Sequence, residues 1–249
     1  MTYPMVLVCS MLRNVEGPLP GMGGGVADYW SQFENQYPAD RLRFCWLEGD
    51  SSDNTFEKLS DIARRDDRVT LFKEDTGRPQ YGSVNAPERM AHLSAIGRQL
   101  VGCVRYCLEK EPEIEYVFYM ESDLLLVHTT MLKLLVDLNK DMVAPLIFQG
   151  HGHQFYDTWG FVGSNGENFW PVAPYSPDLL GSTDPVVRSV GSCFLATREV
   201  WENCTFADNN ALRGFCKDVN EKGFAIHAFS GTKVIHPENH WQHQRRPLP

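Results

Sequence analysis

The chain of 249 residues is 43% hydrophobic and carries a formal net charge of −9 at pH 7. This length suits one large α/β domain or two small ones. The net negative charge disfavours nucleic acid as a partner without excluding it, because an acidic surface gains little from counterion release. No apolar run approaches the roughly 20 residues of a membrane span, and the opening residues do not resemble a signal peptide. The seven cysteines include no C-x-x-C pair. We therefore expect a cytoplasmic protein.

Apolar β-rich runs alternate with helical patterns, which is typical of an α/β domain with a mostly parallel central sheet flanked by helices. In the first half the pattern predicts strands at residues 5–11, 41–47, 69–73 and 116–120, and helices at 26–33, from about 55 and at 87–108. In the second half it predicts helices at 131–138 and 211–222, and strands at 142–148, 187–197, 224–228 and 232–235. Ser52 or Asp53 is expected to cap the helix near residue 55, and Gly223 to end the last helix.

Polar side chains gather at the carboxyl ends of three predicted strands. Arg13 and Asn14 follow the first strand, residues 48–53 follow the second, and residues 121–123 follow the fourth. Ligands of open α/β sheets bind outside this edge, so we expect the three groups to converge on one crevice.

The Glu121-Ser122-Asp123 segment directly follows a buried strand. If the strand continues, residues 121 and 123 point to the same face. Two carboxylates placed in this way hold a hard divalent cation, which can bridge two phosphates. The alternative is a solvated strand end, which any acidic pair can form.

Three other positions offer ligand contacts. Glu48 and Asp50 can accept hydrogen bonds from a nucleobase or ribose, although the same segment can serve only as a turn and helix cap. His236 follows a short apolar strand, and a neutral imidazole can ligate a divalent metal, although most single histidines do not.

Further candidates lie in irregular segments. Residues 149–185 form a long irregular stretch, and such stretches in compact domains are usually functional. Within it, Asp157 stands among the aromatic residues of 155–161, a pattern that suits sugar recognition or an aromatic mini-core. The glycines at 21–25 can cradle phosphate or form a flexible loop. Arg245 and Arg246 can meet a pyrophosphate or belong to a frayed terminus.

The Glu-Gly-Asp-Ser-Ser-Asp-Asn-Thr turn at 48–55 and the acid-x-acid element at 121–123 together resemble the GT-A glycosyltransferase fold, over residues 5–240. The resemblance implies a nucleoside contact for Glu48 and Asp50. It also implies that Asp123, with Glu121 and a later histidine assigned to His236, binds Mn²⁺ or Mg²⁺ together with the donor diphosphate. We therefore expect a single domain with a nucleotide-binding half at 1–127, and an acceptor-binding half with the metal-site tail at 128–249.

A narrower resemblance rests on shorter segments. Phe155-Tyr156-Asp157-Thr158-Trp159-Gly160 and residues 190–195, Val-Gly-Ser-Cys-Phe-Leu, are similar to central segments of the fungal mannan-polymerase and capsule-associated mannosyltransferase families. This similarity leaves both GDP-linked and UDP-linked sugars open as donors. The acceptor would be a glycan or another hydroxyl-bearing molecule.

The resemblance also implies how the reaction would proceed. A metal on Asp123 would act as a Lewis acid on the leaving diphosphate, with Arg98 or Arg245 adding positive charge. Asp157 and Asp208 are the candidate bases for an inverting reaction. The acidic pair of many inverting members is missing at 209–212, which favours retention. The alternatives are a nucleotidyltransferase, or a non-catalytic nucleotide- or glycan-binding module on the same fold.

Overall fold

The computed structural model describes residues 3–16, 32–33, 36–78, 81, 86–150, 154–169, 171, 176–179 and 181–236. The glycine loop at 21–25, most of the predicted helix at 26–33, and Arg245 and Arg246 lie outside the described residues. Within the described part, no helix combines the length and apolarity that a membrane crossing requires.

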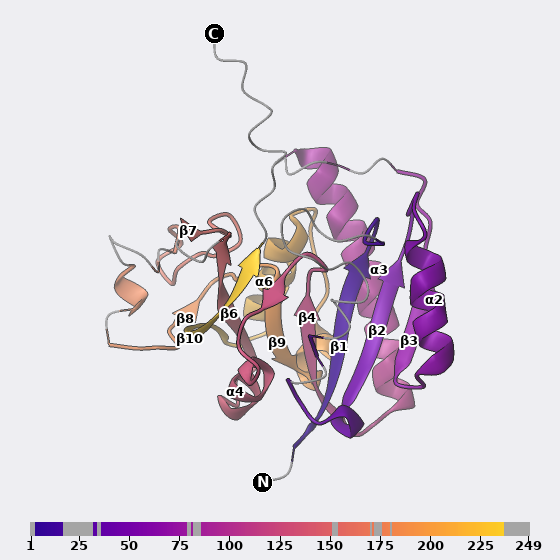
Figure 1. The fold of residues 1–249 in the computed structure, drawn as a ribbon. Helices are drawn as coiled ribbons and strands as arrows, with labels where there is room; N and C mark the ends of the chain where they lie inside the picture. The colour runs from indigo at the N-terminus through magenta and orange to yellow at the C-terminus, as the bar shows by residue number, and fades with distance from the viewer. Residues whose placement is uncertain are drawn as a thin grey trace.

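A large sheet forms the centre of the structure, in the order β3-β2-β1-β4-β9-β6-β10-β5, with β7 beside β6 and β8 beside β10 (Figure 1). The strands are β1 (Met5–Leu12), β2 (Leu42–Glu48), β3 (Val69–Lys73), β4 (Ile114–Met120), β5 (Leu125–Leu126), β6 (Met142–Gln149), β7 (Gln154–Phe155), β8 (Val186–Val187), β9 (Cys193–Thr197) and β10 (Ile226–His236). The helices are η1 (Ala39–Arg41), α2 (Thr55–Arg65), α3 (Pro87–Lys110), α4 (Met131–Asp137), η2 (Pro177–Leu179), α5 (Arg198–Asn203) and α6 (Ala211–Glu221).

The predicted α/β class is confirmed, and the pairings show how the two halves of the sheet differ. Strands β3, β2, β1 and β4 run parallel, so their carboxyl ends meet at one edge. Strand β9 pairs antiparallel with both β4 and β6, and β6 pairs parallel with β10. Strand β1 is buried along almost its whole length, which explains its continuous apolar sequence, since helices cover a parallel sheet.

Two strand predictions were wrong. Residues 187–197 do not form one strand, because β8 pairs with β10 whereas β9 lies between β4 and β6. Residues 224–228 and 232–235 are not two strands either, since β10 runs through both with a register shift between Phe229 and Lys233. In both cases long-range pairing, which local composition does not report, decided the boundaries.

The turns that end the elements follow local chemistry. The N-cap of α2 is Asn54, whose side chain makes no capping hydrogen bond, so the expected cap at Ser52 or Asp53 was wrong. Asp53 instead closes a local turn just before the helix, because its carboxylate accepts a hydrogen bond from the Thr55 backbone N–H at 3.0 Å. Gly223 has a φ of 85° just after α6, a left-handed conformation that glycine adopts at no steric cost, so the expected end of that helix is confirmed.

Candidate active site

Residues 121–124 form a turn that leaves the sheet directly after β4. The Glu121 N–H donates to the Ser192 carbonyl at 3.0 Å, and the Leu124 N–H donates to the Glu121 carbonyl at 3.2 Å. The expectation of an extended segment was therefore wrong, and strand alternation does not set the directions of the two acids. Glu121 lines a cavity, whereas Asp123 faces the end of β10.

Asp123 meets His236, which is the last residue of β10. The Asp123 Oδ2 atom lies 3.1 Å from His236 Nε2, and the histidine side chain is only 4% exposed. The ring of Tyr156 stacks on the imidazole, with 3.8 Å between centroids and 16° between planes. The other oxygen of Asp123, Oδ1, is buried and has no hydrogen-bond partner among the residues that the structure describes. The fold thus brings the two predicted metal ligands together and leaves one carboxylate oxygen unsatisfied.

This arrangement fits a divalent cation that is shared with a ligand. Among the described residues, no three His, Cys, Asp or Glu side chains cluster tightly enough to hold a metal by themselves. Mg²⁺, however, is usually held by one or two carboxylates together with substrate phosphates and water. Asp123 and His236 supply an oxygen and a nitrogen donor on adjacent atoms, and the unpartnered Oδ1 is available to a cation.

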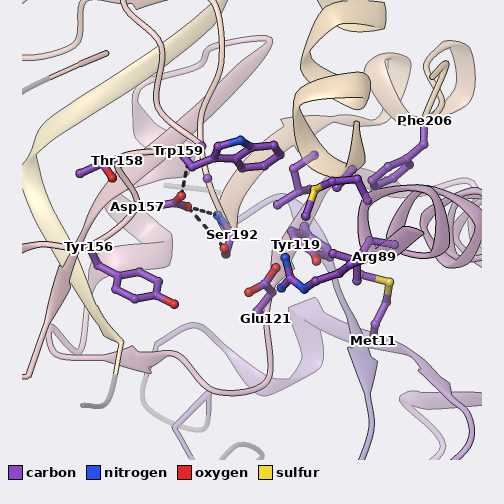
Figure 2. A pocket seen from close by; sticks show the side chains of 16 residues that line it. Met11, Arg89, Tyr119, Glu121, Tyr156, Asp157, Thr158, Trp159, Ser192 and Phe206 are labelled. Atoms are coloured by element: carbon purple, nitrogen blue, oxygen red, sulfur yellow. Dashed lines mark hydrogen bonds between the residues drawn. The ribbon is translucent and has the colours of Figure 1, made fainter. Parts of the chain in front are cut away.

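A cavity of about 280 Å³ is lined in part by Tyr156, the residue that stacks on His236 (Figure 2). Its polar lining residues include Glu121, Asp157, Ser192 and Arg89, and Figure 2 shows Arg89 and Glu121 reaching into it. The remaining lining is largely aromatic and apolar, and includes Met11, Met90, Leu93, Tyr119, Tyr156, Trp159, Phe206 and Leu212. A few polar groups on an otherwise apolar surface are typical of small-molecule sites.

The cavity raises the pKa of both of its carboxyl groups. Burial, followed by the charges of Asp123 and Asp157, raises the pKa of Glu121 to about 8. Burial also raises the pKa of Asp157, although hydrogen bonds from Gly160 and Ser192 oppose the shift. Burial therefore favours the neutral form of Glu121, whereas a nearby positive charge would favour its ionised form.

Asp157 organises the wall of the cavity. Its carboxylate accepts hydrogen bonds from the Gly160 N–H at 2.8 Å, the Ser192 N–H at 3.1 Å and the Ser192 hydroxyl at 3.4 Å. A Cβ atom at Gly160 or Gly191 would lie closer than 3.0 Å to this carboxylate. Asp157 thus joins the 157–160 turn to the segment before β9, and its oxygens are already engaged.

The segments that follow β1, β2 and β3 are joined to one another at the same edge of the sheet. Asn14, with a φ of 52°, accepts a hydrogen bond from the Ser52 N–H at 2.8 Å. Asp50, with a φ of 57°, accepts hydrogen bonds from the N–H groups of Thr76 and Gly77 at 3.0 and 2.8 Å. The Asp50 carboxylate therefore shapes the loop after β3, a structural task that the sequence does not reveal.

Glu48 and Arg13 retain unsatisfied polar atoms at this edge. Glu48 is fully buried, and its Oε1 atom accepts a hydrogen bond from the Ser51 N–H at 3.3 Å, whereas Oε2 has no partner in the described part of the chain. Arg13 donates to the Arg78 carbonyl at 3.0 Å, but its buried Nε is not paired with any described residue. Unpaired buried groups of this kind are the ones that a polar ligand can satisfy.

Two predicted site residues lie away from the cavity lining. Arg98 donates to the Phe206 carbonyl at 3.0 Å and so holds the segment before α6. Asp208 accepts a hydrogen bond from the Asn210 N–H at 2.9 Å and lies 3.6 Å from the Lys217 ammonium group. Neither is among the residues that line the cavity.

Arg89 is the site residue that the sequence analysis missed. Of the described residues that line the cavity, it is the sole lysine or arginine. It lies in the first turn of α3, the helix that follows β3, and the start of such a helix lies at the carboxyl edge of the sheet. This position at the start of the helix is the feature of the sequence that points to Arg89. The prediction named Arg98, which lies farther along the same helix.

The comparisons with known proteins place the fold. No family model matches the chain. Procollagen galactosyltransferase 1-B of Xenopus laevis is 25% identical in an alignment of 151 residues that covers 58% of this chain and 23% of the relative. The human multifunctional procollagen lysine hydroxylase and glycosyltransferase LH3 is 23% identical in an alignment of 192 residues that covers 65% of this chain and 24% of the relative. The chain thus spans about a quarter of the length of these curated relatives.

Solved structures with the same fold cover nearly the whole chain. The crystal structure of GalNAc-T7 with UDP, GalNAc and Mn²⁺ superposes with a TM-score of 0.58 at 14% identity, over 95% of this chain and 44% of that one. The mannosyltransferase PcManGT of Pyrobaculum calidifontis with GDP-Man and Mn²⁺ superposes with a TM-score of 0.55 at 15% identity, over 98% and 60%. The chain has a GT-A fold, and these relatives and structural neighbours are glycosyltransferases.

Proposed function

We propose that the protein is a metal-dependent glycosyltransferase that moves a hexose from a nucleoside-diphosphate sugar to a hydroxyl-bearing acceptor. The observation that carries the proposal is the pairing of Asp123 with His236 beside the cavity, with one buried carboxylate oxygen left unpartnered. Asp123 and His236 would hold Mn²⁺ or Mg²⁺, which supplies Lewis-acid stabilisation of the leaving diphosphate.

The chain's own residues have distinct tasks in this proposal. Glu48 and the neighbouring 13–14 segment bind the nucleoside at the edge of β1 and β2. Arg89 reaches into the cavity and adds positive charge where the diphosphate departs. Residues 1–127 then serve mainly nucleotide binding, while residues 128–249 supply the acceptor side and His236.

The donor is proposed to be GDP-mannose or a UDP-hexose. Structural neighbours hold either nucleotide, since GalNAc-T7 is bound to UDP and PcManGT to GDP-Man. The likeness of residues 155–160 and 190–195 to the fungal mannan-polymerase and capsule-associated mannosyltransferase families supports mannose. In the structure these two segments meet through the Asp157–Ser192 hydrogen bonds. A glycan is the favoured acceptor, and the net charge of −9 continues to disfavour nucleic acid.

Titration of the purified protein with UDP and with GDP, in Mn²⁺ and in EDTA, tests the donor site. We expect one nucleotide to bind in Mn²⁺ and to lose most of its affinity in EDTA, because Asp123 and His236 would hold a cation whose charge offsets that of the diphosphate. Failure of a folded protein to bind either nucleotide would argue for a non-catalytic module. Release of pyrophosphate from a nucleoside triphosphate and a sugar phosphate would instead identify a nucleotidyltransferase.

We also propose retention of the anomeric configuration. The candidate base Asp157 is already engaged, since its carboxylate accepts hydrogen bonds from the N–H groups of Gly160 and Ser192. Asp208, the remaining candidate base, is engaged at the start of α6. NMR of the product or of the sugar released by donor hydrolysis should show the donor's configuration in its first-formed anomer. An inverted anomer would contradict this part of the proposal.

A cytoplasmic location completes the proposal. Its support is that all seven cysteines are free thiols, as is usual in a reducing compartment. Fractionation of the source cells with an antibody against the protein would test it.

A further inference from the structure

Trp159 forms part of the cavity lining, on the turn that follows Tyr156 (Figure 2). The same lining includes the polar groups Glu121 and Ser192. At about 280 Å³ the cavity is at the small end of ligand sites, so it receives one ring rather than a whole nucleotide-sugar. A sugar ring suits this lining, because its C–H face can pack on an indole while its hydroxyls meet the polar side.

Arg213, on α6, contacts Trp159 in two ways. Its Nε donates a hydrogen bond to the Trp159 carbonyl at 2.6 Å, and its guanidinium carbon lies 4.7 Å from the centroid of the indole ring. One side chain therefore holds both the backbone and the ring of the tryptophan. Arg213 is not among the cavity-lining residues, so it supports Trp159 without entering the cavity itself.

The elements behind this contact are firmly held. The Ala211 N–H at the start of α6 donates to the Ser94 hydroxyl of α3 at 2.8 Å, which anchors the helix that carries Arg213. On the other side, the Asp157 carboxylate holds the Gly160 N–H of the same turn. Burial lowers the pKa of Arg213, while the charge of Asp157 opposes that shift, so the guanidinium lies within the field of this carboxylate.

We propose that Arg213 is a positioning residue that fixes the indole of Trp159 as the platform for the donor's sugar ring. The inference rests on the proposed transferase function and deepens it. The Arg213–Trp159 pair contributes to the affinity for the sugar portion of the donor and not to the affinity for its nucleotide portion. An arginine stacked on an aromatic face is favourable when partly desolvated, and lysine cannot reproduce its planar fork.

The test is the ratio of two dissociation constants, that of the nucleotide-sugar to that of the matching nucleotide. UDP-galactose and UDP-glucose are compared with UDP, and GDP-mannose with GDP, all in Mn²⁺. In Arg213→Met we expect this ratio to rise about tenfold for the sugar that the protein accepts, while the nucleotide alone binds within about twofold of wild type. Trp159→Leu should act in the same direction, and Arg213→Lys should fall between wild type and Arg213→Met.

Arg105→Met is the matched control. Arg105 also donates its Nε hydrogen to a tryptophan carbonyl, that of Trp201 at 3.1 Å, but it does not line the cavity. Its loss should lower thermal stability and leave the ratio unchanged. The protein that carries both Trp159→Leu and Arg213→Met should have a ratio within twofold of that of Trp159→Leu alone, because the arginine acts through the indole.

The outcomes separate the two proposals. An unchanged ratio in Arg213→Met for every donor pair, or independent effects in the double variant, would overturn the positioning role of Arg213. If the wild-type protein bound none of the nucleotides, the proposed function itself would fail, and this inference with it. Nucleotide binding in the wild type thus decides the first question, and the ratio decides the second.

Discussion

Asp123→Ala is expected to lower kcat/KM by at least ~10², the scale of losing one strong electrostatic contact in a transition state. Its carboxylate pairs with His236 at 3.1 Å and keeps a buried, unpartnered oxygen, so alanine would remove half of the protein's contribution to the cation site. Nucleotide titration in Mn²⁺ should show the same loss, and the remaining weak binding should no longer respond to EDTA.

Asp137→Ala provides the control for a lost carboxylate. Asp137 is a largely exposed residue that forms an ion pair with Lys133 on α4. Exposed ion pairs contribute little to stability, so this variant should bind and turn over donor like the wild type. Equal Mn²⁺-dependent binding in the Asp123→Ala and Asp137→Ala proteins would contradict the assignment of the cation to Asp123.

Gly191→Ala is expected to have the second large effect, on stability as well as on activity. The new methyl group would fall closer than 3.0 Å to the Asp157 carboxylate. That carboxylate cannot move aside cheaply, because the Gly160 and Ser192 N–H groups hold it. Overpacking together with the loss of buried hydrogen bonds should lower the free energy of unfolding by at least ~3 kcal/mol. Urea denaturation measures this change.

Gly102→Ala separates a steric effect from a general effect of replacing glycine. Gly102 is exposed on α3, and a Cβ atom there would meet no atom within 4 Å. Alanine should therefore raise the free energy of unfolding by up to ~1 kcal/mol through its helix propensity. Wild-type stability and donor affinity in Gly191→Ala would show that the Asp157 carboxylate does not require this close approach.

The candidate site could be predicted only in part. Asp123 and His236 were chosen from their places at strand ends, and the structure brings them into contact. The expected extended backbone at residues 121–123 was wrong, because the chain turns immediately after β4. That turn is stabilised by the Ser192 carbonyl, far along the sequence, and no local pattern reports such a partner.

Asp50 and Asp157 show a second limit. Their carboxylates were expected to meet ligand or substrate, and the structure shows each accepting backbone hydrogen bonds from another loop. The sequence shows that a carboxylate is present and can accept hydrogen bonds. It does not show whether backbone N–H groups of the protein already occupy the carboxylate oxygens.

By itself, the sequence determined the order and kind of most elements and the gathering of polar residues at strand ends. These features follow from local causes, namely the periodicity of apolar residues and the preference of glycine for positive φ. Only the tertiary structure decided that β9 lies between β4 and β6, and that β10 carries His236 to Asp123. The physical reason is that this pairing depends on burial and hydrogen bonding between residues far apart in the chain. Such long-range contacts leave no periodic pattern in the local sequence.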